Sequence, residues 1–245
     1  MGRWLRSYGL LMAWSLLRLR AALPLLVASQ TLIGVGVVVG YGFLIPDVDE
    51  VTALYLSTGA LTIGLITVGM IAAPQVVAQH KFAGILDYQR AMPVPRLAAL
   101  AADGTVWLAL ALPGLAAALG IAALRFDLPL RVSPWVALAV PLVTASSVAI
   151  GYGLAHAAKP EVTAVVTQAV FLVALMFAPI TYPAGQLPGW LARAHDYLPF
   201  AYMAQAIRET VQVPATGVSP TPFLVLTGWC VLGLSITYRV MNRRA

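Results

Sequence analysis

Long apolar runs separated by short polar segments organise this chain. A bilayer core about 30 Å thick requires roughly 20 apolar residues in a helix. Six runs reach that length, some only with their flanking residues: 23–45, 52–78, 97–124, 134–157, 162–180 and 221–241. The fifth is the shortest, and Pro179 and Pro183 end it. The pattern predicts an all-α integral membrane protein with six transmembrane helices.

Composition supports that prediction. Of the 245 residues, 60% are hydrophobic and 10% are charged, whereas soluble domains carry about 25% charged residues. The loops are short, so we expect residues 1–245 to form a single domain. The one cysteine, Cys230, lies in an apolar run and has no partner for an internal disulfide.

The basic residues indicate the orientation. Six spans place both termini on one side of the membrane, and that side receives eleven of the fifteen lysines and arginines. By the positive-inside rule, both termini and residues 80–96 are cytoplasmic. Because the arginines gather at the ends of apolar runs, the net charge of +6 does not indicate nucleic acid as a partner. The excess of arginine over lysine and the high alanine content point to a bacterial plasma membrane.

Residues 1–20 form a predicted helix before the first span. Trp4, Tyr8 and Trp14, together with four arginines, suit the headgroup layer of a membrane. Leucines share the arginine side of this helix, however, so a cytoplasmic extension of the first span fits equally well. Both interpretations stay open on the sequence alone.

The segment 80–96, HKFAGILDYQRAMPVPR, is charged although the flanking runs are apolar. Residues 82–92 have helical spacing, and Pro93 and Pro95 stop the helix. A short charged helix between two spans is a poor membrane anchor. We therefore interpret it as a site where another protein acts on this chain.

A second unusual segment, residues 181–220, joins the last two spans. Pro188 and Pro199 open two short helical stretches, 189–198 and 200–212, and aromatic residues such as Trp190 are typical of a membrane interface. We expect a re-entrant helical hairpin at the extracellular side, covered by protein where it enters the bilayer.

Nucleotide-binding and metal-binding chemistry is missing from the sequence. A P-loop requires a Gly-Lys pair, but Lys81 follows His80 and Lys159 follows Ala158. The three histidines lie on separate loops or span ends, on both sides of the predicted membrane. We therefore expect no catalytic residue, no metal and no bound cofactor in this chain.

Two features of the spans invite functional hypotheses. Asp103 is a carboxylate inside the third span, about two turns past Arg96, and an intramembrane acid suggests function. We predict that it is an anchor reaching water or Arg96, with a proton relay as the alternative.

Gly36 and Gly40 form a GxxxG pattern, which predicts a close helix contact.

These residues resemble the ABC-2 type permeases, the membrane subunits of ABC exporters. The stretch 84–96 is similar to the daunorubicin-resistance branch of drug exporters in its glycine, acidic, basic and proline positions. A second match begins with Phe177-Ala-Pro-Ile-Thr-Tyr-Pro and continues through Leu187-Pro-Gly-Trp-Leu and Leu198-Pro-Phe to Ala206-Ile-Arg. The resemblance covers essentially the whole chain, although many relatives have acidic residues just before the glycine, where this chain has His80 to Ala83.

The resemblance implies a mechanism with named partners. Two permease subunits, identical or different, would pair with two cytoplasmic ABC ATPases that hold the ATP and Mg²⁺. Contacts with the ATPase are implied for Lys81, Gly84, Asp87, Arg90, Pro93 and Arg96. The family's substrate path would run along spans one, two and five, where Thr62, Thr67, Met70, Thr167, Gln168, Phe171 and Met176 are candidates. The hairpin signature consists of Pro179, Pro183, Pro188, Trp190, Pro199 and Arg208.

More than one function is compatible with these features. The leading prediction is export of a hydrophobic or amphiphilic compound such as a drug, an antibiotic or a lipid-like molecule. A polysaccharide exporter would have the same fold, but spans one and two offer few aromatic residues for sugar stacking. An intramembrane enzyme using Ser146 or Ser147 and a proton-coupled carrier using Asp103 are the alternatives from other classes.

Overall fold

The computed structural model describes residues 2–44, 49–85, 94–126, 131–214 and 217–242. Within these ranges the chain is helical apart from turns, loops and an isolated bridge between Arg131 and Gln212. In order, the elements are α1 (Gly2–Leu19), α2 (Leu23–Leu44), α3 (Glu50–Thr67), η1 (Val68–Ala72), α4 (Ala73–Phe82), α6 (Arg96–Phe126), α7 (Val136–Ala157), α8 (Pro160–Phe177), η2 (Ala184–Gln186), α9 (Gly189–His195), α10 (Pro199–Val211) and α11 (Thr221–Asn242).

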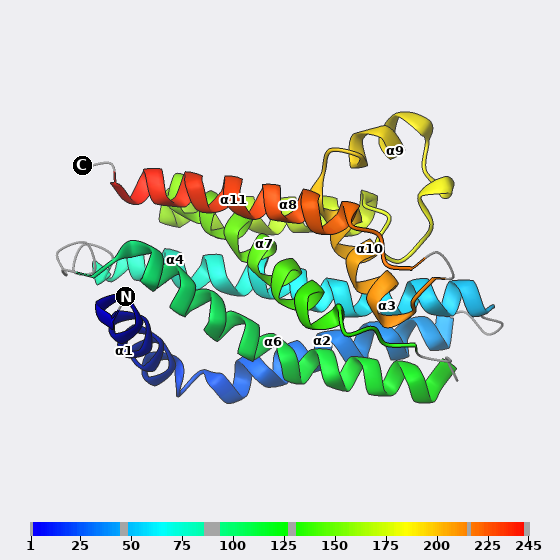
Figure 1. Cartoon of the computed structure of the whole chain (residues 1–245), viewed down its shortest axis with the longest axis horizontal. Helices are drawn as coiled ribbons and strands as arrows, with labels where there is room; N and C mark the ends of the chain where they lie inside the picture. Colours follow the sequence, from blue (N-terminus) through cyan, green and yellow to red (C-terminus); the bar gives the residue numbers. More distant parts are fainter. Residues whose placement is uncertain (1, 45–48, 86–93, 127–130, 215–216, 243–245) are drawn as a thin grey trace.

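Six helices of the described part are long and apolar enough to span a membrane, which confirms the predicted number. They are Leu23–Phe43, Glu50–Phe82, Arg96–Phe126, Val136–Ala157, Pro160–Phe177 and Thr221–Val240. Both termini lie at the same end of the bundle (Figure 1). We call this the N/C end, and the opposite end, near the hairpin of α9 and α10, the hairpin end. The predicted helix in residues 1–20 is present as α1, which packs against α6 at the N/C end.

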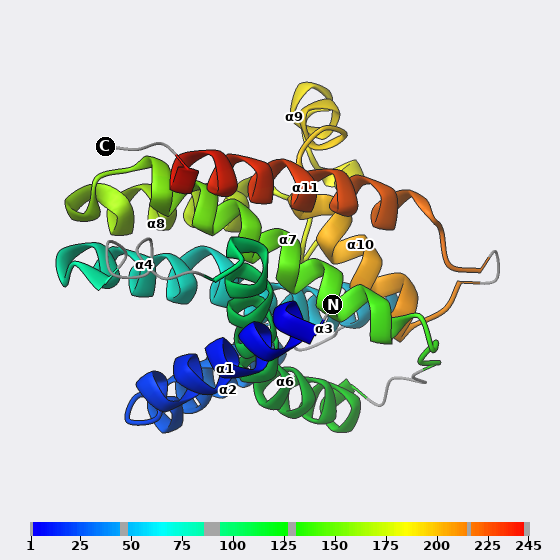
Figure 2. The same cartoon turned by 60° about the vertical axis from the view of Figure 1, so that its left-hand side comes forward.

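The centre of the bundle is built from α3, η1 and α7. Both flanks of α3 are buried, including Leu61, Leu65 and Ile66. Two glycines allow α7 to approach closely: a β-carbon on Gly151 would clash with the backbone oxygen of Gly69. Small residues permit such backbone proximity between membrane helices, where close packing drives association. Figure 2 shows α7 running between α11 and the helices α3 and α6.

The second span contains a widened turn. Pro74 has no N–H to donate and its ring would clash with the carbonyl one turn earlier in a regular helix. The chain instead forms the π-helical turn η1, where the Ala73 N–H donates to the Val68 carbonyl oxygen. A single π turn inside a longer helix is the usual form of this element, so the span continues without a break from Glu50 to Phe82.

One sequence expectation is wrong in detail, and a second is not met within this chain. The predicted separate helix 82–92 does not begin at Phe82, because α4 carries the second span through Phe82 before a turn at Ala83 and Gly84. Residues 86–93 lie outside the described residues. The GxxxG pair Gly36 and Gly40 makes no close helix contact within the described chain, since added β-carbons would meet nothing within 4 Å. A close contact with a helix of another chain stays a prediction.

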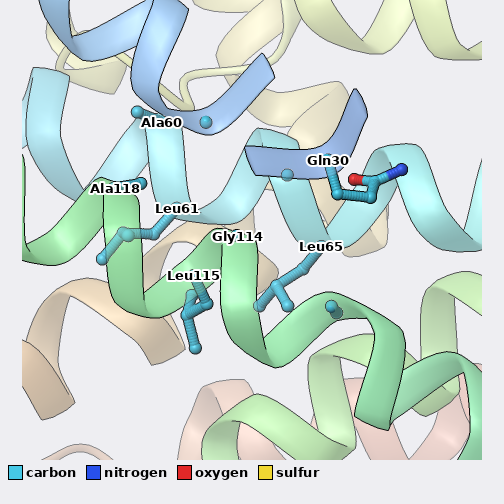
Figure 3. A pocket seen from close by; sticks show the side chains of 10 residues that line it. Gln30, Ala60, Leu61, Leu65, Gly114, Leu115 and Ala118 are labelled. Carbon is cyan, nitrogen blue, oxygen red and sulfur yellow. The ribbon is translucent and has the colours of Figure 1, made fainter. Parts of the chain in front are cut away.

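The close packing of α2 uses a neighbouring glycine instead. A β-carbon on Gly34 would lie 3.1 Å from the Ala118 β-carbon of α6, and one on Gly114 would lie 3.0 Å from the Gln30 backbone. The crevice where α2, α3 and α6 meet is correspondingly tight, about 10 Å³ (Figure 3). Gln30 lies at this crevice, and its side-chain oxygen is buried with no hydrogen-bond partner in the described structure.

The hairpin between the last two spans contains both predicted helical stretches. α9 projects away from the bundle, whereas α10 lies against it (Figure 1). Phe200, Met203 and Ile207 of α10 are buried against α3, α7 and α11. Protein therefore covers one face of α10, and the entry of this hairpin into the bilayer stays a prediction.

Candidate functional site: a lateral groove and a buried polar cluster

A groove of about 610 Å³ lies between α2, the α3–η1 helix and α8. These are the first, second and fifth spans. The lining is mostly apolar, with glycines on α2 and aliphatic or aromatic side chains opposite: Ile33, Gly36, Val37, Gly40, Tyr41, Ile63, Thr67, Ile71, Gln168, Phe171, Leu175 and Met176. The open glycines of α2 give the groove its width, because larger side chains there would fill it.

The structure brings four of the seven predicted substrate-path residues together in this groove. They are Thr67, Gln168, Phe171 and Met176. The other three point elsewhere and are fully or almost fully buried: Thr62, Met70 and Thr167. The Thr62 and Thr167 hydroxyls donate to carbonyls one turn earlier in their own helices, at 2.8 and 2.9 Å.

Few polar groups face the groove. The Thr67 hydroxyl donates to the Ile63 carbonyl at 2.7 Å, so its hydrogen is already engaged. The exposed Gln168 amide forms no hydrogen bond to the described part of the chain. An apolar cavity with a small number of placed polar groups is typical of a site for a small amphiphilic molecule.

A second constellation lies at the N/C end, where a buried polar cluster joins α1 to α6 and α7. The Ser15 hydroxyl donates to one oxygen of the Asp103 carboxylate at 2.9 Å. The Tyr152 hydroxyl donates to the other oxygen at 3.5 Å and accepts from the Trp107 indole at 2.9 Å. The expected partner Arg96 is therefore wrong, because two hydroxyls from α1 and α7 hold this carboxylate. The expected contact with water stays a prediction.

Arg18 completes the cluster. Its guanidinium lies 4.2 Å from the centre of the Trp14 ring, and one nitrogen lies 3.2 Å from the His80 Nδ1. The other two nitrogens are buried without a hydrogen-bond partner in the described structure. Burial lowers the pKa of the Arg18 guanidinium, and the nearby Asp103 carboxylate acts in the opposite direction. The contacts of Ser15 and Arg18 therefore link α1 to two other helices, α6 and α4.

Lys81 has a structural role that the sequence did not predict, and its predicted contact with the ATPase stays a prediction. Its ammonium donates to the carbonyls of Ala155, His156 and Ala158 at 2.6, 3.0 and 2.8 Å. These carbonyls end α7, where the helix dipole and unpaired acceptors favour a cation. Lys81 therefore joins the end of the second span to the end of the fourth.

The remaining predicted coupling residues are only partly described. Gly84 has φ +67, a left-handed conformation that glycine adopts without steric cost, and it ends α4. Arg96 begins α6. Asp87, Arg90 and Pro93 lie outside the described residues, so their contacts stay a prediction.

In the hairpin, Arg208 contacts both α3 and the chain that follows α8. Its guanidinium lies 3.7 Å from the centre of the Tyr55 ring, donates to the Ile180 carbonyl at 2.8 Å and approaches the Thr58 hydroxyl at 3.3 Å. It therefore joins α10 to α3 and to the chain after α8.

The predicted prolines of the hairpin lie at the ends of its helices. Pro179 and Pro183 follow α8, Pro188 caps α9 and Pro199 begins α10. The side chain of Trp190 is exposed.

Comparison with known protein families shows to which family this chain belongs. The sequence profile described as ABC-2 type transporter matches residues 8–211. The chain belongs to the ABC-2 type transporter family. The match includes α1 from residue 8 on, the first five spans and the hairpin, which together contain the groove and the polar cluster. No curated protein matches the chain.

Family membership fixes the general role of this permease. It is a multi-pass membrane component of an ABC transporter, works with an ATPase and is not itself catalytic. The two serines that were candidates for an intramembrane enzyme have structural contacts, because the Ser146 and Ser147 hydroxyls donate to carbonyls of their own helix. Sequence reasoning missed Ser15, Trp107 and Tyr152 of the cluster, because a serine or an aromatic residue in an apolar helix carries no local signal of a distant partner.

Proposed function

We propose that this permease exports a hydrophobic or amphiphilic compound, such as a drug, an antibiotic or a lipid-like molecule. The observation that supports this proposal is the 610 Å³ groove between α2, α3 and α8. Its apolar walls suit an acyl or aromatic body, and the amide of Gln168 suits one polar group. Sugar stacking would require an aromatic lining, but the groove offers Tyr41 and Phe171 alone.

The pathway would form between two permease subunits. Gly36 and Gly40 lie in the groove with open space around them, so a second subunit, identical or different, can face the same surface. Two such grooves facing each other would enclose a substrate that one chain leaves exposed to lipid. Two ABC ATPases would hold ATP and Mg²⁺ and supply the energy.

The ATPases would act at the N/C end. This end carries α1 and the segment between α4 and α6, and its excess of basic residues supports a cytoplasmic location in a bacterium. Asp87 and Arg90 are the candidates for contact with the ATPase. The links from α1 to Asp103 and from Lys81 to α7 offer a route by which a movement of this end reaches the spans.

Transport by variants of the groove tests the substrate path. Permease and ATPase would be reconstituted in vesicles, and ATP-dependent movement of a fluorescent amphiphile would be measured. Gly36→Trp should fill the groove and abolish transport, whereas Gly120→Trp, at an exposed glycine of α6 with equal open space, should not. Equal transport by both variants would remove the groove from the pathway.

Association with the ATPase tests the coupling assignment separately. Asp87→Ala combined with Arg90→Ala should reduce co-purification of the ATPase without changing the thermal stability of the permease. If ATP-dependent transport and association survive both substitutions, these residues are not the contact. Transport that survives Asp103→Asn would exclude the proton-coupled carrier.

A further inference from the structure

The widened turn η1 lies where the second span passes both the groove and the centre of α7. Ile71 of this turn lines the groove, and so does Thr67, which directly precedes the turn. Gly69 faces α7 instead, since a β-carbon there would clash with the Ser147 side chain. One turn of helix therefore contacts the groove on one side and the central helix of the bundle on another.

The backbone of η1 has fewer of the regular helical hydrogen bonds than the helices on either side. In a regular helix the N–H of Ala73 would donate to Gly69, and the N–H of residue 74 would donate to Met70. Here the Ala73 N–H donates to the Val68 carbonyl oxygen, and Pro74 has no N–H. Two successive carbonyls therefore lose their regular donors. Because helices kink at prolines and at π turns, the second span bends more easily at η1 than elsewhere.

The contact between η1 and α7 is made by backbone atoms. A β-carbon on Gly151 would clash with the Gly69 carbonyl oxygen and would lie 2.8 Å from the Pro74 ring. Interdigitating side chains fix the angle at which two helices cross, but Gly69 and Gly151 have no side chains to interdigitate. This contact therefore supports the turn while leaving its angle to α7 free to change.

The two halves of the second span are held by different parts of the bundle. α3 packs mostly against α2, α6 and α10, whereas α4 packs against α7 and α8. Arg208 of α10 contacts Tyr55 and Thr58 of α3. Lys81 joins the last turn of α4 to the end of α7. A movement of the N/C end therefore acts on α4, while the hairpin holds α3.

From this combination we propose that η1 is a joint at which the second span bends, and that the bend sets the width of the groove. α4 tilts on the contact between Gly69 and Gly151 while α3 stays in place, and Ile71 moves with the turn. The permease samples both widths without ATP, and a force on the N/C end shifts the balance between them. The effect on transport rests on the proposed function of the groove, whereas the bend itself does not.

Methionine methyl groups are native probes of this motion. Met70 lies in η1 and is fully buried, Met176 lines the groove on α8, and Met203 is fully buried in α10. The full chain would be labelled with ¹³C at the methionine methyls, placed in lipid nanodiscs and measured by relaxation dispersion, which detects motion on the μs–ms timescale of helix bending. We expect exchange at Met70 and Met176 with a common rate, and none at Met203.

The comparison of these three methyls decides the proposal without any variant. A flat dispersion profile at Met70 would overturn it. Exchange of all three methyls at one rate would show a motion of the whole bundle and would also overturn it.

Matched proline variants test the cause of the exchange. Pro74→Ala supplies an N–H for the Met70 carbonyl, so that a regular helix becomes possible. The exchange at Met70 should then disappear, and the midpoint of thermal unfolding should stay the same or rise. Pro113→Ala makes the same change at an exposed proline inside α6, outside the groove lining, and should leave the exchange unchanged. Exchange that survives Pro74→Ala, or that is lost equally in both variants, would contradict the proposal.

Transport provides a second measurement, with permease and ATPase reconstituted in vesicles. Pro74→Ala should reduce ATP-dependent transport several-fold without weakening association with the ATPase, whereas Pro113→Ala should transport normally. If Gly36→Trp leaves transport intact while Pro74→Ala abolishes the methyl exchange, the joint stands and the groove is not the pathway. If Gly36→Trp abolishes transport while Met70 shows no exchange, the groove stands and the joint is refuted.

Discussion

Lys81 provides the sharpest test of how the N/C end is held together. Replacing it by methionine keeps the length of the side chain and removes the ammonium. The ammonium donates to three carbonyls at the end of α7, at 2.6, 3.0 and 2.8 Å. Methionine cannot donate to any of them, so α7 loses the cation at its C-terminal end.

The magnitude follows from these contacts. A hydrogen bond from a charged group contributes about 1.5–3 kcal/mol, and a cation at a helix C-terminus about 0.3–2 kcal/mol. One ammonium donates to all three carbonyls, and water can hydrogen-bond to part of the helix end once the ammonium is removed. The contributions therefore do not add fully. We expect Lys81→Met to lower the free energy of unfolding by about 2–4 kcal/mol. For a chain of this size the midpoint of thermal unfolding would fall by about 5–15 °C.

The sequence offers a matched control in its other lysine. Lys159 is exposed, lies just after the same helix end and caps α8 without a side-chain hydrogen bond. Lys159→Met should therefore change the unfolding midpoint by less than about 2 °C. Both variants would be purified in detergent, and unfolding followed by intrinsic fluorescence and by loss of the monodisperse species.

The same two variants separate the observed role of Lys81 from the predicted one. If Lys81 acts by holding α7, ATPase association should fall in proportion to the loss of stability. If Lys81 were a direct contact with the ATPase, association would fall while the unfolding midpoint stayed unchanged. That second result, or equal midpoints for the two lysine variants, would refute the reasoning.

Three further perturbations have expected outcomes. Gly84→Ala should destabilise the permease by about 1 kcal/mol, because φ +67 disfavours a β-carbon, and Gly84→Asn should cost less in the same thermal assay. Ser15→Ala and Asp103→Asn should show a coupling energy of about 1–2 kcal/mol in a double-mutant cycle on the free energy of unfolding. Additive effects would show that the two side chains do not form a stabilising hydrogen bond. Arg208→Lys should destabilise the permease by about 2 kcal/mol, because lysine lacks the planar fork that contacts a ring and a carbonyl together; Arg193→Lys, on the projecting α9, should leave the midpoint unchanged.

The six spans were predictable because hydropathy and length decide them locally. The predicted run 134–157 compares with the helix Val136–Ala157, and the prolines predicted to open α9 and α10 do so. The second span was predicted to end near residue 78 but continues to Phe82. Its last turn carries polar side chains that are held by neighbouring helices, so the apolar pattern stops before the helix does.

The face that each span turns to its neighbours could not be predicted. Ile63, Thr67 and Ile71 recur every four residues and lie on the groove side of the second span, while Thr62 and Met70 lie on the buried side. Both sides are apolar, so periodicity does not distinguish them. The polar cluster is still less predictable from sequence, because its shortest bond joins Ser15 to a residue 88 positions away.

The charged segment 80–96 now divides into structural and unassigned positions. Lys81 holds the end of α7, Gly84 supplies the left-handed turn that stops α4, and the Pro95 carbonyl accepts from the N–H groups of Ala98 and Ala99 at the start of α6. The path of the chain therefore accounts for residues at these positions without a partner. The predicted contact with the ATPase stays a prediction for all six residues, and Asp87 and Arg90 test it most directly, because their substitution should weaken association without lowering stability, opposite to the result expected for Lys81.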